Sequence, residues 1–297
     1  MTATARPAAG VAVAAPQWRI GTDRVGAARA ALAAGADLLH LDFGGAHRGP
    51  LLSEPAELRA AGAVGRDIRV DVLAVNHIND IGLADDRGTA RPTALAVLER
   101  ALDCALRLDV RVLHVPGFRR SLPATAGLRA GTVDALRTLC ERIAEAGAAP
   151  GPGSGPGPGR STGPGSGAGI TLAYESPLGA RESLALARAV DHPALRLVLD
   201  TGNLKEAGHD PLAFARAVSA PGLLLPDLHV KEPAPPAAGG AVPAPGTAFD
   251  DLPELLRHCV VRSVLVENDY RHAPGRLRED ITLCRTAVGP SHDEDPR

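Results

Sequence analysis

The sequence predicts an α/β protein folded as a single (β/α)8 barrel, a TIM barrel. Eight short apolar runs rich in Val, Leu and Ile alternate with segments of helical periodicity along the 297 residues. Uninterrupted apolar runs are typical of parallel strands buried on both faces, and eight βα repeats favour closure into a barrel. A doubly wound open sheet is the alternative. No Gly-rich phosphate turn follows the first run, where the chain reads Gly21-Thr22-Asp23-Arg24, and this favours the barrel.

The strands are expected at residues 11–14, 37–42, 68–75, 110–115, 170–175, 195–200, 223–230 and 264–267. Pro226 lies inside the seventh run, and because proline cannot donate to a central ladder we expect a bulge or a late strand start there. Asp210 before Pro211 is a helix-start signal. Apolar residues recur at helical spacing in three sets, Leu95/Leu98/Leu102/Leu106, Val133/Leu136/Cys140/Ile143 and Leu277/Ile281/Cys284/Val288.

One segment departs from this pattern, because residues 147–169 are rich in Gly, Pro and Ser and contain no large apolar side chain. We expect a barrel over residues 10–288 with a disordered insertion at 147–169, and disordered tails at 1–9 and 289–297. A domain boundary is the alternative, but the strand pattern resumes at Ile170. A second Pro/Ala-rich stretch, residues 233–245, follows the seventh strand and is expected on the catalytic face.

Composition and charge favour small-molecule chemistry. A formal net charge of −2 and a pI near 6.6 give no broad cationic surface, so no nucleic acid is expected as a partner. No apolar run is long enough for a membrane span. Four cysteines far apart, in segments expected to be helical and without a CxxC pair, indicate buried thiols and a cytoplasmic location. Whether the chain forms a homo-oligomer is left open by the sequence.

Polar residues end four consecutive predicted strands, namely Glu175, Asp200, His229 and Glu267. Taken singly, such a carboxylate is usually a helix cap or a solvated charge, and such a histidine is usually structural. The carboxyl ends of neighbouring barrel strands converge, so together the four predict one shared metal site. Three carboxylates and one imidazole suit Mn²⁺ or Mg²⁺ first, with Co²⁺ or Zn²⁺ as alternative ions.

The blocks at residues 170–175, 197–203, 227–232 and 264–270 resemble the sugar phosphate isomerase/epimerase superfamily, related to xylose isomerase, and occur in that family's order. The similarity extends from about residue 20 to 286. It implies that Glu175, Asp200, His229 and Glu267 bind one divalent ion. It also implies that Glu175 and Glu267 act as acid and base on opposite faces of a keto sugar or a related polyol ketone. Charge withdrawn by the ion would stabilise an enediolate intermediate.

Substrate contacts are expected from Lys231, Asn203 and His40. Lys231 either approaches the developing oxyanion or pairs with Glu232, and Asn203 stands where many family members have a histidine. His40, together with Asp42 and His114, either faces the pocket or is structural. Two other functions remain open: a non-catalytic barrel that binds a metabolite or a partner, and an endonuclease-like phosphodiesterase. The latter would need a histidine where Val115 stands.

Overall fold

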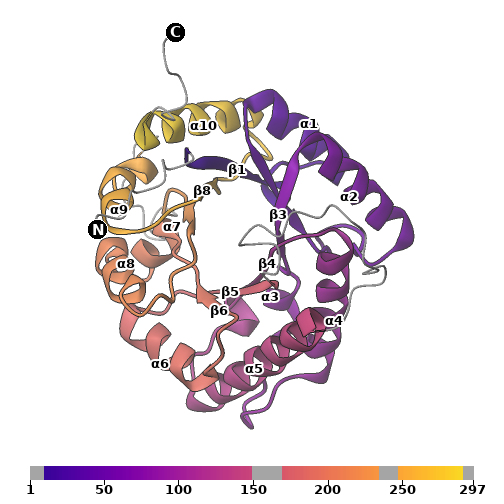
Figure 1. The fold of residues 1–297 in the computed structure, drawn as a ribbon, viewed down its shortest axis with the longest axis vertical. Coiled ribbons are helices and arrows are strands. Elements are labelled where there is room, and N and C mark those ends of the chain that lie inside the picture. The colour runs from indigo at the N-terminus through magenta and orange to yellow at the C-terminus, as the bar shows by residue number, and fades with distance from the viewer. Residues whose placement is uncertain (1–9, 149–168, 234–246, 290–297) are drawn as a thin grey trace, which may run out of the picture. The chain divides into compact units, whose positions relative to one another are not determined.

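The computed structural model describes residues 10–148, 169–233 and 247–289, which contain eight strands alternating with helices (Figure 1). The described chain divides into two compact units, one formed by residues 40–198 and one by residues 1–39 with 199–297. Strand β2 (Leu38–Asp42) runs across the boundary between them.

The unit of residues 40–198 contains four parallel strands that pair in the order β3-β4-β5-β6. Their bounds are Arg69–Ala74 for β3, Val112–Pro116 for β4, Thr171–Glu175 for β5 and Leu195–Leu197 for β6. The helices are α2 (Pro55–Asp67), α3 (Ile78–Ile81), α4 (Pro92–Arg107), α5 (Ala126–Ala148) and α6 (Ala180–Val190), with a 3-10 turn at Arg119–Ser121. Helix α5 lies between α4 and α6 and contacts both (Figure 1).

The other unit has three parallel strands in the order β1-β8-β7, with bounds Ala12–Pro16, Ser263–Val266 and Asp227–Val230. Its helices are α1 (Arg24–Ala34), α7 (Thr201–Glu206), α8 (Pro211–Ser219), α9 (Leu252–His258) and α10 (Pro274–Val288), with 3-10 turns at Gln17–Arg19 and Thr247–Phe249. Helix α10 contacts α1 and α9 (Figure 1). Ala14, Leu38 and Leu265 form a buried cluster against which Trp18 packs.

All eight predicted strands are present, and two of them differ from the predicted bounds by three or more residues at one end. β6 stops at Leu197 instead of residue 200, because Asp200 already serves as the N-cap of α7. β7 begins at Asp227 instead of residue 223, which confirms the late start expected from Pro226. The carbonyl of Pro226 still accepts a hydrogen bond from the Arg262 backbone N–H at 2.7 Å.

The predicted helix starts and apolar stripes are mostly confirmed. Asp210 caps α8 by accepting a hydrogen bond from the backbone N–H of Leu212 at 2.9 Å. In α4, Leu98 and Leu102 are buried as expected, whereas Leu106 is 46% exposed and was wrongly assigned to the buried stripe. Smaller residues complete the buried face of α4: Ala94, Val97, Ala101, Cys104 and Ala105.

Helix α5 extends through Ala148, so Gly147 belongs to a helix rather than to the predicted insertion. Residues 149–168, the two predicted tails at 1–9 and 290–297, and residues 234–246 lie outside the described residues. All four cysteines are free thiols. Cys259 was predicted to be helical, but it follows α9 and is half-buried. Among the described helices, none is both long and apolar enough to cross a membrane.

Candidate active site

Three of the four predicted metal ligands, Asp200, His229 and Glu267, lie together in the unit that contains β1, β7 and β8. One carboxylate or ring-nitrogen atom from each lies within 4.8 Å of the others. All three are buried, with exposed fractions of 1%, 1% and 8%. Two carboxylates and an imidazole at this spacing have the chemistry and the separation of a divalent-cation site.

Backbone pairing sets the register of these three residues. The N–H of His229 donates to the carbonyl of Leu199 at 2.9 Å, which places Asp200 and His229 side by side in a parallel bridge. The N–H of Glu267 donates to the carbonyl of Val230 at 2.9 Å, one residue beyond His229. These backbone hydrogen bonds therefore place three ligand-type side chains side by side near the carboxyl ends of β7 and β8.

Glu267 is held by residues that the sequence analysis did not single out. The indole Nε1 of Trp18 donates to its Oε1 at 3.1 Å, and Arg19 Nη2 lies 3.6 Å from the same oxygen. The other oxygen, Oε2, lies 3.3 Å from His229 Nδ1. Trp18 is the single tryptophan of the chain and follows β1 directly, at the strand end where barrel enzymes carry functional residues. Its position after the first predicted strand was the sequence signal that could have identified Trp18 as a site residue.

Lys231 and Asn203, both expected to contact substrate, contact each other. The Lys231 ammonium donates to Asn203 Oδ1 and lies 3.5 Å from Asp200 Oδ2, with its side chain 13% exposed. Glu232, the alternative partner of Lys231, forms an ion pair with Arg276. The other oxygen of Asp200, Oδ1, accepts the backbone N–H of Asn203 at 2.7 Å as the N-cap of α7.

The remaining predicted residues belong to the unit of residues 40–198. Glu175 ends β5 and is buried beside His114 of β4, with His114 Nε2 2.8 Å from Glu175 Oε2. His114 is therefore the immediate polar partner of Glu175. His40 is fully buried in β2, and Asp42 Oδ1 accepts the backbone N–H of Asn76 at 3.4 Å. A role of His40 in substrate binding stays a prediction.

A buried polar network lies immediately after Glu267 in the chain. Asn268 Nδ2 and the Tyr270 hydroxyl donate to Asp280 Oδ2 of α10 at 2.7 and 3.0 Å. Burial raises the pKa of Asp280, and the hydrogen bonds from Asn268 and Tyr270 partly oppose that rise. Asn268 Oδ1 also accepts the backbone N–H of Glu232 at 2.9 Å. The network thus ties the segments after β7 and β8 to α10.

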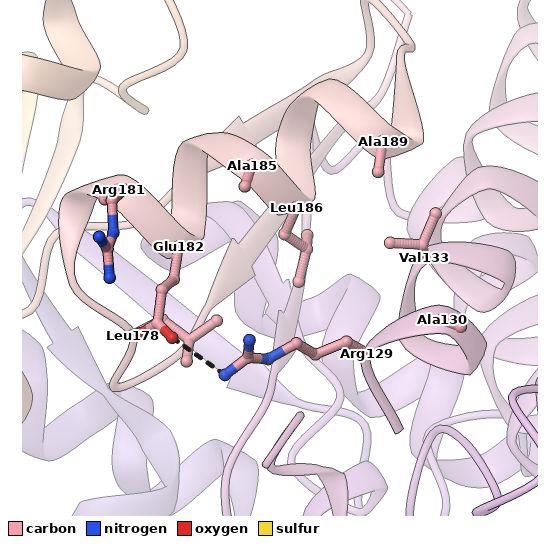
Figure 2. A pocket seen from close by; sticks show the side chains of 9 residues that line it. All are labelled: Arg129, Ala130, Val133, Leu178, Arg181, Glu182, Ala185, Leu186 and Ala189. Atoms are coloured by element: carbon pink, nitrogen blue, oxygen red, sulfur yellow. Dashed lines mark hydrogen bonds and ion pairs between the residues drawn. The ribbon is translucent and has the colours of Figure 1, made fainter. Parts of the chain in front are cut away.

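A cavity of about 520 Å³ lies elsewhere, between the outer helices α5 and α6 (Figure 2). Val133 and Leu186 are among the apolar side chains that line it. Arg129 Nη2 donates to Glu182 Oε1 at 2.9 Å, and both of these residues also line the cavity. None of the predicted site residues lines this cavity.

Comparison with known proteins agrees with this fold. The family model described as "Xylose isomerase-like TIM barrel" matches residues 28–276. The chain belongs to this family, which confirms the predicted barrel and the resemblance, and it is an enzyme of the sugar isomerase and epimerase class. A curated relative from Actinoplanes sp. (strain ATCC 31044 / CBS 674.73 / SE50/110), 2-epi-5-epi-valiolone 7-phosphate 2-epimerase, is 34% identical over 284 residues, covering 92% of this chain and 93% of the relative.

Solved structures of similar fold include two epimerases. D-allulose 3-epimerase from Methylomonas sp. has a TM-score of 0.61 at 15% identity, covering 94% of this chain and 99% of its own. 3-Keto-D-glucoside 4-epimerase from E. coli has a TM-score of 0.62 at 16% identity, covering 93% of this chain and 99% of its own. At these identities the likeness concerns the fold. Family membership and the epimerase relative argue against the non-catalytic alternative.

Proposed function

We propose that this protein is a divalent-metal-dependent epimerase that inverts a carbon beside the ketone of a cyclic polyol or keto sugar through an enediolate. The observation that carries the proposal is the buried set of Asp200, His229 and Glu267, whose ligand atoms lie within 4.8 Å of one another. Two carboxylates and one imidazole fit Mn²⁺ or Mg²⁺, with Co²⁺ or Zn²⁺ as further candidates. Glu175 is added to the set on the family resemblance.

What the ion supplies when bound is positive charge beside the ketone oxygen, which stabilises the enediolate. Glu267 is oriented for proton transfer, because Trp18 and Arg19 hold one of its oxygens while the other faces His229. Glu175 is oriented by His114 in the same way. In the proposed reaction one glutamate removes the proton from the carbon, the C–H electron pair enters the enediolate, and the other glutamate returns a proton to the opposite face.

The substrate class is proposed from the relative that is 34% identical. Its name specifies a valiolone 7-phosphate and inversion at carbon 2, so we propose a phosphorylated cyclic polyol ketone as the first substrate to test. A keto sugar without phosphate is the second. The endonuclease-like alternative has no supporting observation, since Val115, and not a histidine, occupies the position that such a site requires.

The test follows solvent deuterium into the carbon beside the ketone. The protein, stripped of metal and then supplied with Mn²⁺ or Mg²⁺, is incubated in deuterated water with each ketone, phosphorylated and dephosphorylated. We expect exchange and epimerisation that disappear with chelation and return with added ion. Full exchange in the chelated protein would refute metal dependence, and the absence of exchange into every cyclic polyol ketone and keto sugar would refute the epimerase assignment.

A further inference from the structure

Lys231 occupies a place that the backbone of α7 leaves open only because residue 202 is glycine. A Cβ atom built on Gly202 would lie 2.4 Å from Lys231 Cγ and 2.9 Å from its Cε. Carbon atoms at rest pack at about 3.5–4.0 Å, so no other residue fits at 202 without moving the lysine. The aliphatic part of Lys231 is thus packed against the first turn of α7.

The charged end of Lys231 is held at two points within the same unit. It donates a hydrogen bond to Asn203 Oδ1, and it lies 3.5 Å from the carboxylate oxygen Oδ2 of Asp200. That oxygen belongs to the residue that contributes to the set with His229 and Glu267. Because Asp200 is 1% exposed, its charge has little access to water and requires a nearby cation.

The use of lysine here contrasts with the rest of the sequence. The chain has 32 Lys and Arg residues, and only Lys205 and Lys231 are lysines. Both belong to this neighbourhood: Lys205 lies on α7 and pairs with Asp251 at 2.6 Å. A compact ammonium on a flexible stem fits the narrow path beside Gly202, whereas the planar fork of arginine is broader.

We propose that Lys231 is the built-in counter-cation of Asp200, positioned by Asn203 and Gly202, and that it competes with the divalent ion for this carboxylate. Asn203 is then a positioning residue that acts through Lys231, in place of the substrate contact expected from the sequence. The competition rests on the metal site of the proposed function, whereas the positioning of Lys231 does not.

The test measures Mn²⁺ affinity by calorimetry on metal-stripped protein. Lys231→Met removes the charge but keeps an unbranched chain beside Gly202, and it is expected to tighten Mn²⁺ binding at least tenfold by removing repulsion of the divalent ion. Lys205→Met is the matched control and should change affinity less than twofold. Asn203→Ala should tighten binding by a smaller factor, and should add nothing in the Lys231→Met background.

Mn²⁺ binding by Lys231→Met that is unchanged within twofold, or weaker, overturns the proposal. If neither the wild type nor Lys231→Met binds Mn²⁺, the proposed function fails, and urea unfolding of the metal-free protein decides the inference. A shift of the unfolding midpoint by Asn203→Ala that vanishes in the Lys231→Met background supports the positioning of Lys231. An equal shift in both backgrounds overturns it.

Discussion

The hydrogen bond from Trp18 to Glu267 gives the most direct test of how this site is held. Trp18→Phe keeps an aromatic ring packed on Ala14, Leu38 and Leu265 but removes the donor to Glu267 Oε1. A hydrogen bond to a charged group contributes about 1.5–3 kcal/mol. Since Trp18 is only half-buried, the lower end applies, and kcat/KM should fall about tenfold to thirtyfold at 1.4 kcal/mol per tenfold.

Arg19 provides a graded comparison, because it approaches the same oxygen at 3.6 Å with its side chain 31% exposed. An exposed ion pair contributes about 0.2–1 kcal/mol, so Arg19→Met should lower kcat/KM less than about fivefold. The assay is epimerisation or proton exchange with Mn²⁺ at saturation, together with Mn²⁺ affinity. In the wild type, the emission of the single tryptophan should also change when Mn²⁺ binds, because its indole contacts a proposed ligand.

Two results would contradict this reasoning. If Trp18→Phe retains kcat/KM within twofold, the hydrogen bond does not position Glu267. If Arg19→Met is the more damaging variant, the arginine charge rather than the indole donor controls the carboxylate.

Three further predictions concern the rest of the chain. Asp200→Asn and His229→Ala should lose metal first and recover activity partly with excess ion, whereas Glu175→Gln and Glu267→Gln should keep the ion and lose turnover, and one of the two Gln variants should still exchange the substrate proton with solvent. Identical behaviour of all four variants in metal content, exchange and turnover contradicts the two-base mechanism. Replacing residues 149–168 with a short Gly/Ser linker should leave Mn²⁺ affinity and the unfolding midpoint unchanged, and a lost metal site in a folded variant would refute this. Burial raises the pKa of both Cys140 and Cys284 to about 12, so these thiols stay protonated up to strongly alkaline pH. A thiol reagent at pH 8 should therefore modify one cysteine of the native protein, the half-buried Cys259, and Cys259→Ser should abolish that reaction.

The fold was predictable because buried parallel strands have a local signature. Their apolar runs stand out in the sequence, and even the late start of β7 followed from one proline. The end of β6 was missed because Asp200 caps a helix, and the backbone turns toward that helix before the apolar run suggests it. Leu106 was misassigned because each four-residue step advances about 40° around a helix of 3.6 residues per turn, so Leu98, Leu102 and Leu106 move progressively away from the buried face.

In the site, too, residues marked by a local sequence pattern were predictable, and contacts between distant residues were not. Strand-end residues such as Asp200, His229 and Glu267 are identified by their position after an apolar run. The contact of Trp18 with Glu267 joins residues 249 positions apart and leaves no periodic trace. The contact of Lys231 with Asn203 depends on the path of the lysine side chain, which spacing in the sequence does not determine.

The clearance between Gly202 and Lys231 links two positions that lie 29 residues apart and places them under one evolutionary constraint. Any substitution at 202 adds a Cβ where the lysine stem runs, at 2.4 Å from its Cγ. The two positions should therefore change together across relatives, with a larger residue at 202 accompanied by a shorter one at 231. A lineage that lost the lysine would lose the two side-chain contacts at 202, whereas the backbone carbonyl of residue 231, 3.0 Å from the same Cβ position, would still favour glycine, and its metal site would evolve with a different counter-charge.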